Sequence, residues 1–166
     1  MPPTRASAGR QAAPRRPKAD SDPLALFTTL ARTGLFLDAL QRECLGDHGL
    51  SFPEYSVLRL LQRAPEHQRA PSLLAEQVVC TTGAMTKLVD RLQRAGLVER
   101  TPAPNDRRSV LVRLTPAGDQ RADAAARSYR SGRERVLDRL GERKADRIHA
   151  SLRQLLAILE ADRSDR

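Results

Sequence analysis

The sequence predicts a mainly helical chain with one short β-hairpin. Apolar residues recur at helical spacing in several stretches, and they alternate with polar residues over a strand length only after Gly96. Helix-start signals recur at Asp22-Pro23, at the capping-box spacing of Ser51 and Glu54, and at Thr115-Pro116. We therefore expect six helices, with a strand–turn–strand unit between the fourth and the fifth.

The stretch 80–95 is the most informative one. Its large apolar residues fall at i, i+3, i+4 and i+7 and hence on one helical face. Thr81 can cap the start of a helix over 82–95, and Gly96 can end it in a left-handed conformation. A short helix over 72–79 precedes it across a tight turn, an order typical of a helix-turn-helix. The inner face consists of Met85, Leu88, Val89 and Leu92, and the outer face of Thr82, Thr86, Lys87, Asp90, Arg91 and Arg94.

A β-hairpin follows this helix. Strands are expected over 97–100 and 109–114, where Val110, Val112 and Leu114 alternate with period two, and a turn over 101–108. A helix-turn-helix followed by a hairpin is a winged helix. The expected wing, 103–109, carries Arg107 and Arg108 beside Asp106. An arginine at a hairpin tip can enter a narrow minor groove of DNA, and Asp106 can hold one of the two guanidinium groups in a bidentate pair.

Several motifs resemble the MarR family of transcriptional regulators, over roughly residues 24–162. The most specific of them are an Asp-x-Arg wing and the Leu-Thr-x-x-Gly that follows it. The motifs are Leu74-Ala75-Glu76, Leu88-Val89-Asp90-Arg91-Leu92, Gly96-Leu97-Val98-Glu99-Arg100, Asp106-Arg107-Arg108-Ser109 and Leu114-Thr115-Pro116-Ala117-Gly118. The resemblance implies a homodimeric winged-helix repressor or activator, often released from DNA by a small molecule or an oxidant.

The remaining segments complete the expected organisation. Residues 1–21 form a basic tail without large apolar side chains, which we expect to be disordered. Residues 22–166 form the domain, with the winged helix at about 51–115. The helix at about 23–46 is apolar on more than one face, and the segment 145–159 carries an apolar seam at helical spacing. Both need a partner, so we expect the helices at about 23–46 and 116–162 to form a dimerisation layer.

These features predict a sequence-specific transcriptional regulator, a repressor acting as a homodimer on a pseudo-palindromic operator. The helix 82–95 is expected in the major groove and the wing in the minor groove. Arg91 is expected to meet phosphate, and Gly83 to permit close backbone approach. The predicted DNA-binding residues are Thr81, Thr82, Gly83, Thr86, Lys87, Arg91, Asp106, Arg107 and Arg108.

A small-molecule effector is also expected, in a cleft between the dimer layer and the winged helix that the family resemblance implies. An anionic aromatic compound should weaken operator binding by favouring one lobe spacing. Cationic and aromatic residues on the two flanking helices are the candidates for contacting it. These candidates are Arg32, Phe36, Tyr55 and Arg59, and the alternative is that the two aromatics are core residues and the two arginines solvated.

Composition limits the other functions. The net charge of +9 fits a nucleic-acid partner, although an arginine-rich bias can also come from codon usage. The three histidines and two cysteines show no metal-ligand spacing, no catalytic constellation is present, and no apolar run reaches membrane length. We therefore expect a cytoplasmic protein that is not an enzyme and has no cofactor.

Two alternatives remain open. One is a redox-sensing regulator: Cys44, near the end of the first helix, could be exposed, whereas Cys80 fits a small buried hydrophobe in the helix-turn-helix turn. The other is a winged helix that binds protein without binding specific DNA. The hydroxyl and cationic outer face of helix 82–95 favours DNA, and Asp90 argues mildly against it.

Overall fold

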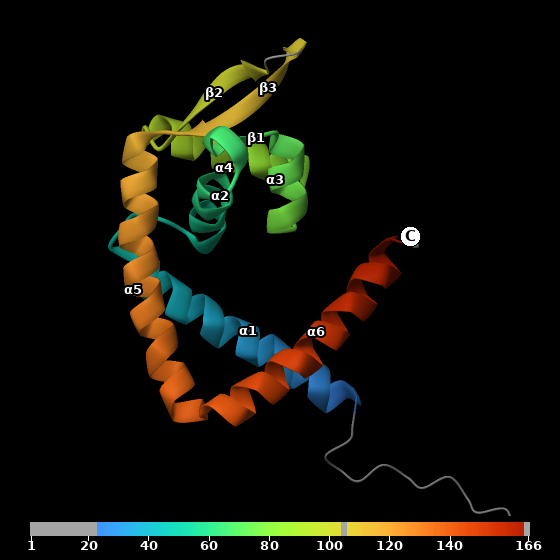
Figure 1. Ribbon diagram of the computed structural model, residues 1–166. Coiled ribbons are helices and arrows are strands. Elements are labelled where there is room, and N and C mark those ends of the chain that lie inside the picture. Colours follow the sequence, from blue (N-terminus) through green and yellow to red (C-terminus); the bar gives the residue numbers. More distant parts are fainter. Residues whose placement is uncertain (1–22, 104–105, 165–166) are drawn as a thin grey trace, which may run out of the picture. The chain divides into compact units, whose positions relative to one another are not determined.

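The computed structural model describes residues 23–103 and 106–164, without the side chains of residues 23, 106–108, 163 and 164 (Figure 1). Contacts divide the chain into two compact units, Met1–Leu37 and Asp38–Arg166. The described part of the first unit is the beginning of helix α1 (Pro23–Gly46), and the division falls inside this helix. The expected tail, residues 1–21, and the expected N-cap Asp22 lie outside the described residues.

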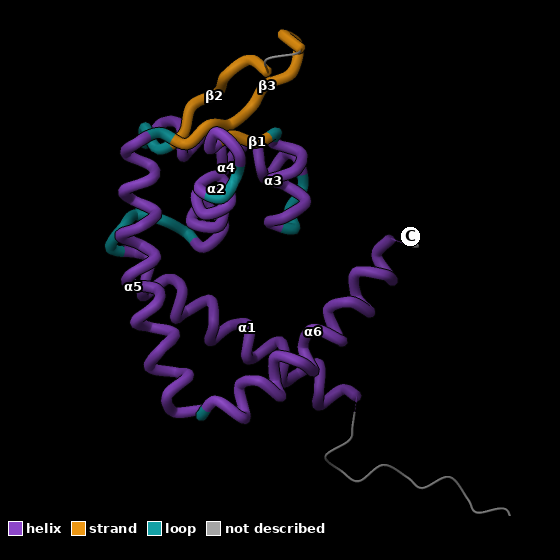
Figure 2. Tube along the Cα trace, in the orientation of Figure 1, coloured by secondary structure: helices purple, strands orange, loops and turns teal. Residues whose placement is uncertain are grey.

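The second unit contains a winged helix followed by two long helices. The expected order of helices and strands is confirmed, and Figure 2 shows the strands gathered beside the three short helices. The elements are α2 (Phe52–Gln62), the 3-10 turn η2 (Pro65–His67), β1 (Gln68–Arg69), α3 (Pro71–Val78), α4 (Thr82–Arg94), β2 (Val98–Ala103), β3 (Asp106–Leu114), α5 (Pro116–Leu140) and α6 (Glu142–Ser164).

Capping side chains start these helices where the sequence predicts. The hydroxyl of Ser51 accepts from the backbone N–H of Glu54, and the Glu54 carboxylate accepts from the backbone N–H of Ser51, which makes the capping box of α2. Thr81 caps α4 by accepting from Ala84, and Thr115 caps α5 by accepting from Gly118. Gly96 has a positive φ of 70° just after α4, as expected.

The core consists almost entirely of Leu, Val and Ala, which follows from the scarcity of aromatic residues in the chain. All four inner residues of α4 are buried, as predicted, and they pack with α2, α3 and the base of the hairpin. Two close approaches need glycine. A Cβ on Gly118 would overlap the carbonyl oxygen of Leu97, and a Cβ on Gly132 would overlap Sγ of Cys44.

The expected hairpin geometry is wrong in two respects, the length of the turn and the position of Val110. The predicted turn over 101–108 is largely strand, because β2 runs to Ala103 and β3 starts at Asp106. A bulge separates Pro102 from Ala103 in the register, and an edge strand with a bulge tolerates a proline that lacks an N–H. Val110, expected to face inward with Val112 and Leu114, is 43% exposed, because the hairpin extends beyond the core.

The segment 64–71, expected to be a polar loop, contains η2 and the short strand β1. Gln68 pairs with Arg113 and Arg69 with Val112, so β1 lies beside β3 and completes a three-stranded antiparallel sheet in the order β1-β3-β2. A strand of two residues shows no period-two pattern, so the sequence could not reveal it. Helix α3 also starts one residue earlier and ends one residue earlier than expected, with Val79 in the left-handed region.

Candidate nucleic-acid interface and ligand cleft

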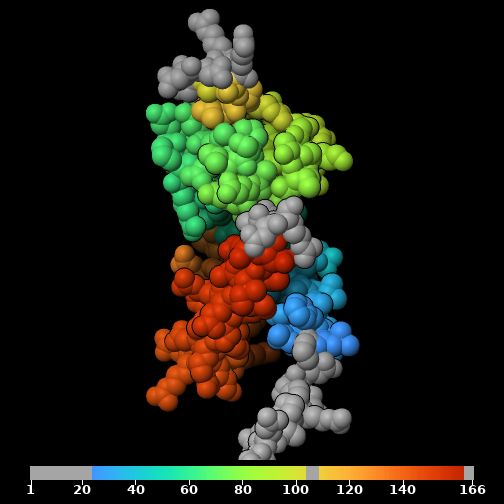
Figure 3. Space-filling view, turned by 90° about the vertical axis from the view of Figure 1, so that its right-hand side faces the viewer, coloured from blue at the N-terminus to red at the C-terminus, as the bar shows by residue number. Residues whose placement is uncertain are grey.

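The start of α4 and its N-cap expose five of the residues predicted to bind DNA. Thr81, Thr82, Gly83, Thr86 and Lys87 are all exposed. A Cβ on Gly83 would meet no atom within 4 Å, so the backbone here is open to a partner. Figure 3 shows the side chains of α3 and α4 next to each other on one face of the winged helix. The face therefore presents hydroxyls, one ammonium group and bare backbone, groups that suit base edges and phosphates.

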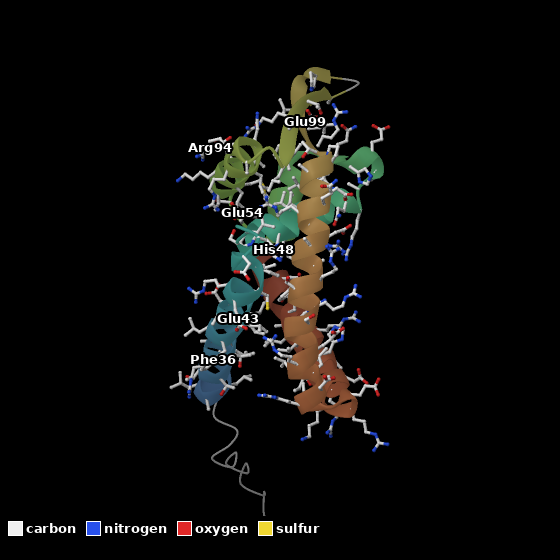
Figure 4. All side chains as sticks on the ribbon, turned by 90° about the vertical axis from the view of Figure 1, so that its left-hand side faces the viewer. Phe36, Glu43, His48, Glu54, Arg94 and Glu99 are labelled. Carbon is white, nitrogen blue, oxygen red and sulfur yellow. The ribbon has the colours of Figure 1, made fainter. Side chains whose placement is uncertain are left out.

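Arg91 joins this face to the start of α2. Its Nε lies 3.1 Å from Oε1 of Glu54, whose side chain is only 10% exposed. The other carboxylate oxygen, Oε2, accepts from the backbone N–H and the hydroxyl of Ser51. Figure 4 marks Glu54 at the first turn of α2. Arg91 itself remains 54% exposed, so its terminal Nη groups are available for a phosphate while its Nε is held.

A second polar network, which the sequence interpretation missed, joins α4 to the wing. Nη2 of Arg100, on β2, lies 2.6 Å from the carboxylate of Asp90, and its Nη1 donates to Gln93 at the same distance. The Asp90 carboxylate, which argued mildly against DNA, is therefore neutralised by a neighbouring strand. Arg94, which Figure 4 labels at the end of α4, lies beside this network and donates from Nε to the carbonyl of Asp90.

The wing residues Asp106, Arg107 and Arg108 form the first part of β3, so their backbone lies at the far end of the hairpin. Their side chains lie outside the described part of the structure. The two-residue loop at 104–105 lies outside it as well. Nearer the base, Arg113 pairs with Glu99 across the two strands at 3.1 Å, which ties the hairpin together on its exposed side.

A cleft of about 540 Å³ lies between α2, α3 and α5. Two of the four predicted ligand residues, Tyr55 and Arg59, line it. The sequence analysis did not predict its other lining residues, which come from α2, from the residue after α2, and from α3 and α5. The cationic and aromatic ones among them are Phe52, Arg63, Tyr129, Arg130 and Arg133.

The other two predicted ligand residues, Arg32 and Phe36, lie on the part of α1 that belongs to the first unit. Both are exposed within that unit, and Phe36, which Figure 4 labels, is 72% exposed. They do not line the cleft described above.

The cysteines lie where a reactive thiol is not expected. Cys44 is 8% exposed and packs against Gly132, so the expectation that it could be exposed is wrong. The crossing of α1 by α5 at a glycine covers it. Cys80 is half-buried in the turn before α4 and packs against the core, and both thiols are free.

The described part of the chain shows neither a metal-ligand cluster nor a membrane-spanning helix. Between residues 23 and 164, leaving out the wing tip, no three His, Cys, Asp or Glu side chains are grouped as a metal site requires. No helix in the described part of the chain combines the length and the apolar character needed to cross a membrane.

The fold and the polar outer face of α4 define a winged helix-turn-helix protein. A family model described as the MarR family matches residues 50–110. The chain is 28% identical over 139 residues to the HTH-type transcriptional regulator PecS of Dickeya dadantii, covering 82% of this chain and 83% of that protein. The chain is thus similar to the MarR family of transcriptional regulators, in its winged helix and over most of its length.

Two further relatives agree with this assignment. The HTH-type transcriptional repressor YetL of Bacillus subtilis is 27% identical over 127 residues, which cover 76% of each chain. The crystal structure of Sco5413, a MarR family regulator from Streptomyces coelicolor, matches with a TM-score of 0.75 and 26% identity. That match covers 83% of this chain and 95% of Sco5413. These relatives are regulators of transcription and not enzymes.

Proposed function

We propose that this protein is a homodimeric repressor that binds a pseudo-palindromic DNA operator through α4 and the wing. The observation that carries the proposal is the open first half of α4, where Thr82, Gly83, Thr86 and Lys87 are exposed above a fully buried inner face. Such a helix can enter a major groove without disturbing the core behind it. The relative YetL is named a repressor, which supports this direction of regulation.

The proposed contacts divide into two kinds. Thr82, Thr86 and Lys87 lie at the N-terminal end of α4, where a recognition helix meets base edges. Arg91 lies further along α4, and its exposed guanidinium group suits the phosphate backbone. Arg107 or Arg108 contacts the adjacent minor groove, with Asp106 orienting one of them.

The proposed dimer rests on exposed apolar side chains in the helices outside the winged helix. In the first unit, the start of α1 exposes Leu24, Leu26, Phe27, Leu35, Phe36 and Leu37. In the second unit, α6 exposes Ile148, Leu152, Leu156, Ile158 and Leu159. Exposed apolar surface of this extent in a single chain indicates burial against a second copy. The helices at about 23–46 and 116–162 are thus the proposed dimerisation layer, and 51–115 the proposed DNA-binding part.

Release by a small molecule completes the proposal. The cleft between α2, α3 and α5 borders α2, the helix whose first turn holds Arg91. A ligand there shifts operator affinity only if it binds one arrangement of the dimer more tightly than the other. Of the four residues predicted from the sequence to contact the effector, Tyr55 and Arg59 line this cleft.

Footprinting on the DNA next to the protein's own gene tests the main proposal. We expect protection of two half-sites about one helical turn apart. Thr86→Ala and Lys87→Ala should weaken the protection, whereas Arg139→Ala, an exposed residue near the end of α5, should not. If no DNA is protected beyond non-specific background, the winged helix is a protein-interaction module instead.

A further inference from the structure

The cleft between α2, α3 and α5 is lined by several cationic side chains. Its cations are Arg59, Arg63, Arg130 and Arg133, and no Asp or Glu side chain is among the residues that line it. Four guanidinium groups around about 540 Å³ create a positive potential that favours anions. The number of these charges that remain uncompensated indicates how many negative charges a ligand needs.

Among the described residues, only one of the four arginines has a carboxylate partner. Nη1 of Arg59 lies 3.3 Å from Asp123 and also donates to Gln62. Within the described residues, Arg63 and Arg130 form no ion pair at 4.0 Å or less, and neither does Arg133, which lies over the Tyr129 ring at 4.9 Å. Among the described residues, three of the positive charges that line the cleft therefore have no carboxylate partner.

Aromatic rings form one wall of the same cleft. Phe52, Tyr55 and Tyr129 are half-buried and pack edge-on or tilted, with centroids 5.8 to 6.3 Å apart. Gln77 from α3 accepts from Arg69 through Oε1, which leaves its NH2 group free to donate into the cleft. A planar ring can pack on this wall while its substituents reach the arginines.

We propose that the cleft binds an aromatic dianion, a planar ring carrying either a phosphate group or two carboxylates. A single carboxylate satisfies one guanidinium group by a bidentate pair and leaves two charges uncompensated. A second negative charge engages Arg63 or Arg130 across the cleft, and the gain is largest at low ionic strength because these arginines are exposed. The inference rests on the effector site in the proposed function and specifies its ligand.

The chain offers an internal reporter for this test. It contains no tryptophan and only two tyrosines, Tyr55 and Tyr129, and both line the cleft. Tyrosine emission, corrected for ligand absorbance, therefore reports on this site alone, and calorimetry on the DNA-free protein gives the affinity. The probes are benzoate, isophthalate, phenyl phosphate and inorganic phosphate. Comparing them separates the contributions of the aromatic ring, the number of negative charges and the type of anionic group to the affinity.

Isophthalate or phenyl phosphate should bind at least about tenfold more tightly than benzoate, and inorganic phosphate more weakly than phenyl phosphate. Arg63→Gln/Arg130→Gln should reduce the advantage of the dianion over benzoate to less than about threefold. The matched control is Arg127→Gln/Arg139→Gln, which removes two exposed charges from α5 outside the cleft and should keep the advantage.

Equal affinities for benzoate and both dianions in the parent protein would overturn the inference, whatever the variants do. Inorganic phosphate as tight as phenyl phosphate would overturn the aromatic part. Because these titrations contain no DNA, their failure is separate from that of the proposed function. A protein that protects its operator but binds no dianion contradicts only the inference, and one that binds a dianion but no DNA contradicts only the operator proposal.

Discussion

The carboxylate of Glu54 closes the first turn of α2 and, through its other oxygen, holds Nε of Arg91 on α4 at 3.1 Å. One buried side chain thus acts both as the helix cap and as the partner of a predicted DNA contact. The pair links α4 to the first turn of α2, and the Arg91 side chain stays 54% exposed.

Replacing Glu54 should therefore affect stability and binding together. Glu54→Ala removes the cap and leaves Arg91 without its partner, so we expect the free energy of unfolding to fall by about 1–3 kcal/mol. In a double-mutant cycle with Arg91→Ala, the coupling should be about 0.5–1 kcal/mol, since Arg91 is half-exposed. Urea unfolding of the four proteins measures both quantities. A coupling of zero would show that the pair does not contribute to the free energy of unfolding.

The wing is tested by two single substitutions. Arg108→Ala should weaken operator binding by about 1–3 kcal/mol, the loss expected for one specific contact. Arg107→Ala is the comparison, because the sequence places both arginines beside Asp106. Titration of operator DNA with each folded variant decides which residue contacts the groove. Unchanged affinity in both would remove the wing from the proposed interface.

Substitution of Gly83 should affect the stability of the fold and the affinity for DNA in different ways. No atom lies within 4 Å of the position that a Cβ would take, and alanine favours helix over glycine by up to about 1 kcal/mol, so Gly83→Ala should fold at least as stably as the parent. If the backbone approaches DNA closely there, the same substitution should weaken operator binding. Thermal unfolding and a gel-shift titration measure the two effects. Parent-like binding would contradict the close approach.

Substitution of Gly118, unlike that of Gly83, should destabilise the fold. A Cβ there would overlap the carbonyl oxygen of Leu97, a backbone atom that cannot move aside, so Gly118→Ala should lower the free energy of unfolding by about 1–3 kcal/mol. Gly34→Ala is the control, because a Cβ on Gly34 would meet nothing within 4 Å. Chemical unfolding compares the two variants. A stable Gly118→Ala protein would mean that β2 and α5 can separate without cost.

Assembly has its own test. Sedimentation at micromolar concentration should show a dimer, since Leu152 and Leu156 on α6 are exposed in the single chain. Leu156→Glu should shift the protein toward monomers and weaken operator binding, because one subunit reaches only one half-site. A folded monomer of the parent protein at that concentration would contradict the proposed dimer.

The sequence was sufficient for the elements whose signals are local. The capping residues Ser51, Thr81 and Thr115 each start a helix as expected, because a cap depends on atoms within three residues. The inner face of α4 was equally predictable from its spacing. The hairpin length and β1 were not, because strand pairing joins residues far apart, as Gln68 and Arg113 are.

The same distinction applies to the candidate sites. The exposure of Thr82, Thr86 and Lys87 followed from helical periodicity. The partners of Arg91 and Arg100 did not, because Glu54 and Asp90 come close to them only through tertiary packing. In the cleft, Tyr55 and Arg59 were found from their place on α2, whereas the α5 arginines became visible only when α5 packed against α2.

The junction after α4 has a mechanical consequence. The Thr115 hydroxyl donates to the carbonyl of Gly96, the Thr115 N–H donates to that of Leu97, and Gly118 packs against the same carbonyl. The end of α4, the start of β2 and the first turn of α5 are therefore bonded to one another within a few residues. Any rotation of the first turn of α5 must carry the recognition helix and the wing with it as one rigid body. Under the proposed release by a small molecule, we therefore expect this junction to move as a unit, and hydrogen exchange at Leu97 and Thr115 should stay slow in both the DNA-bound and the released states.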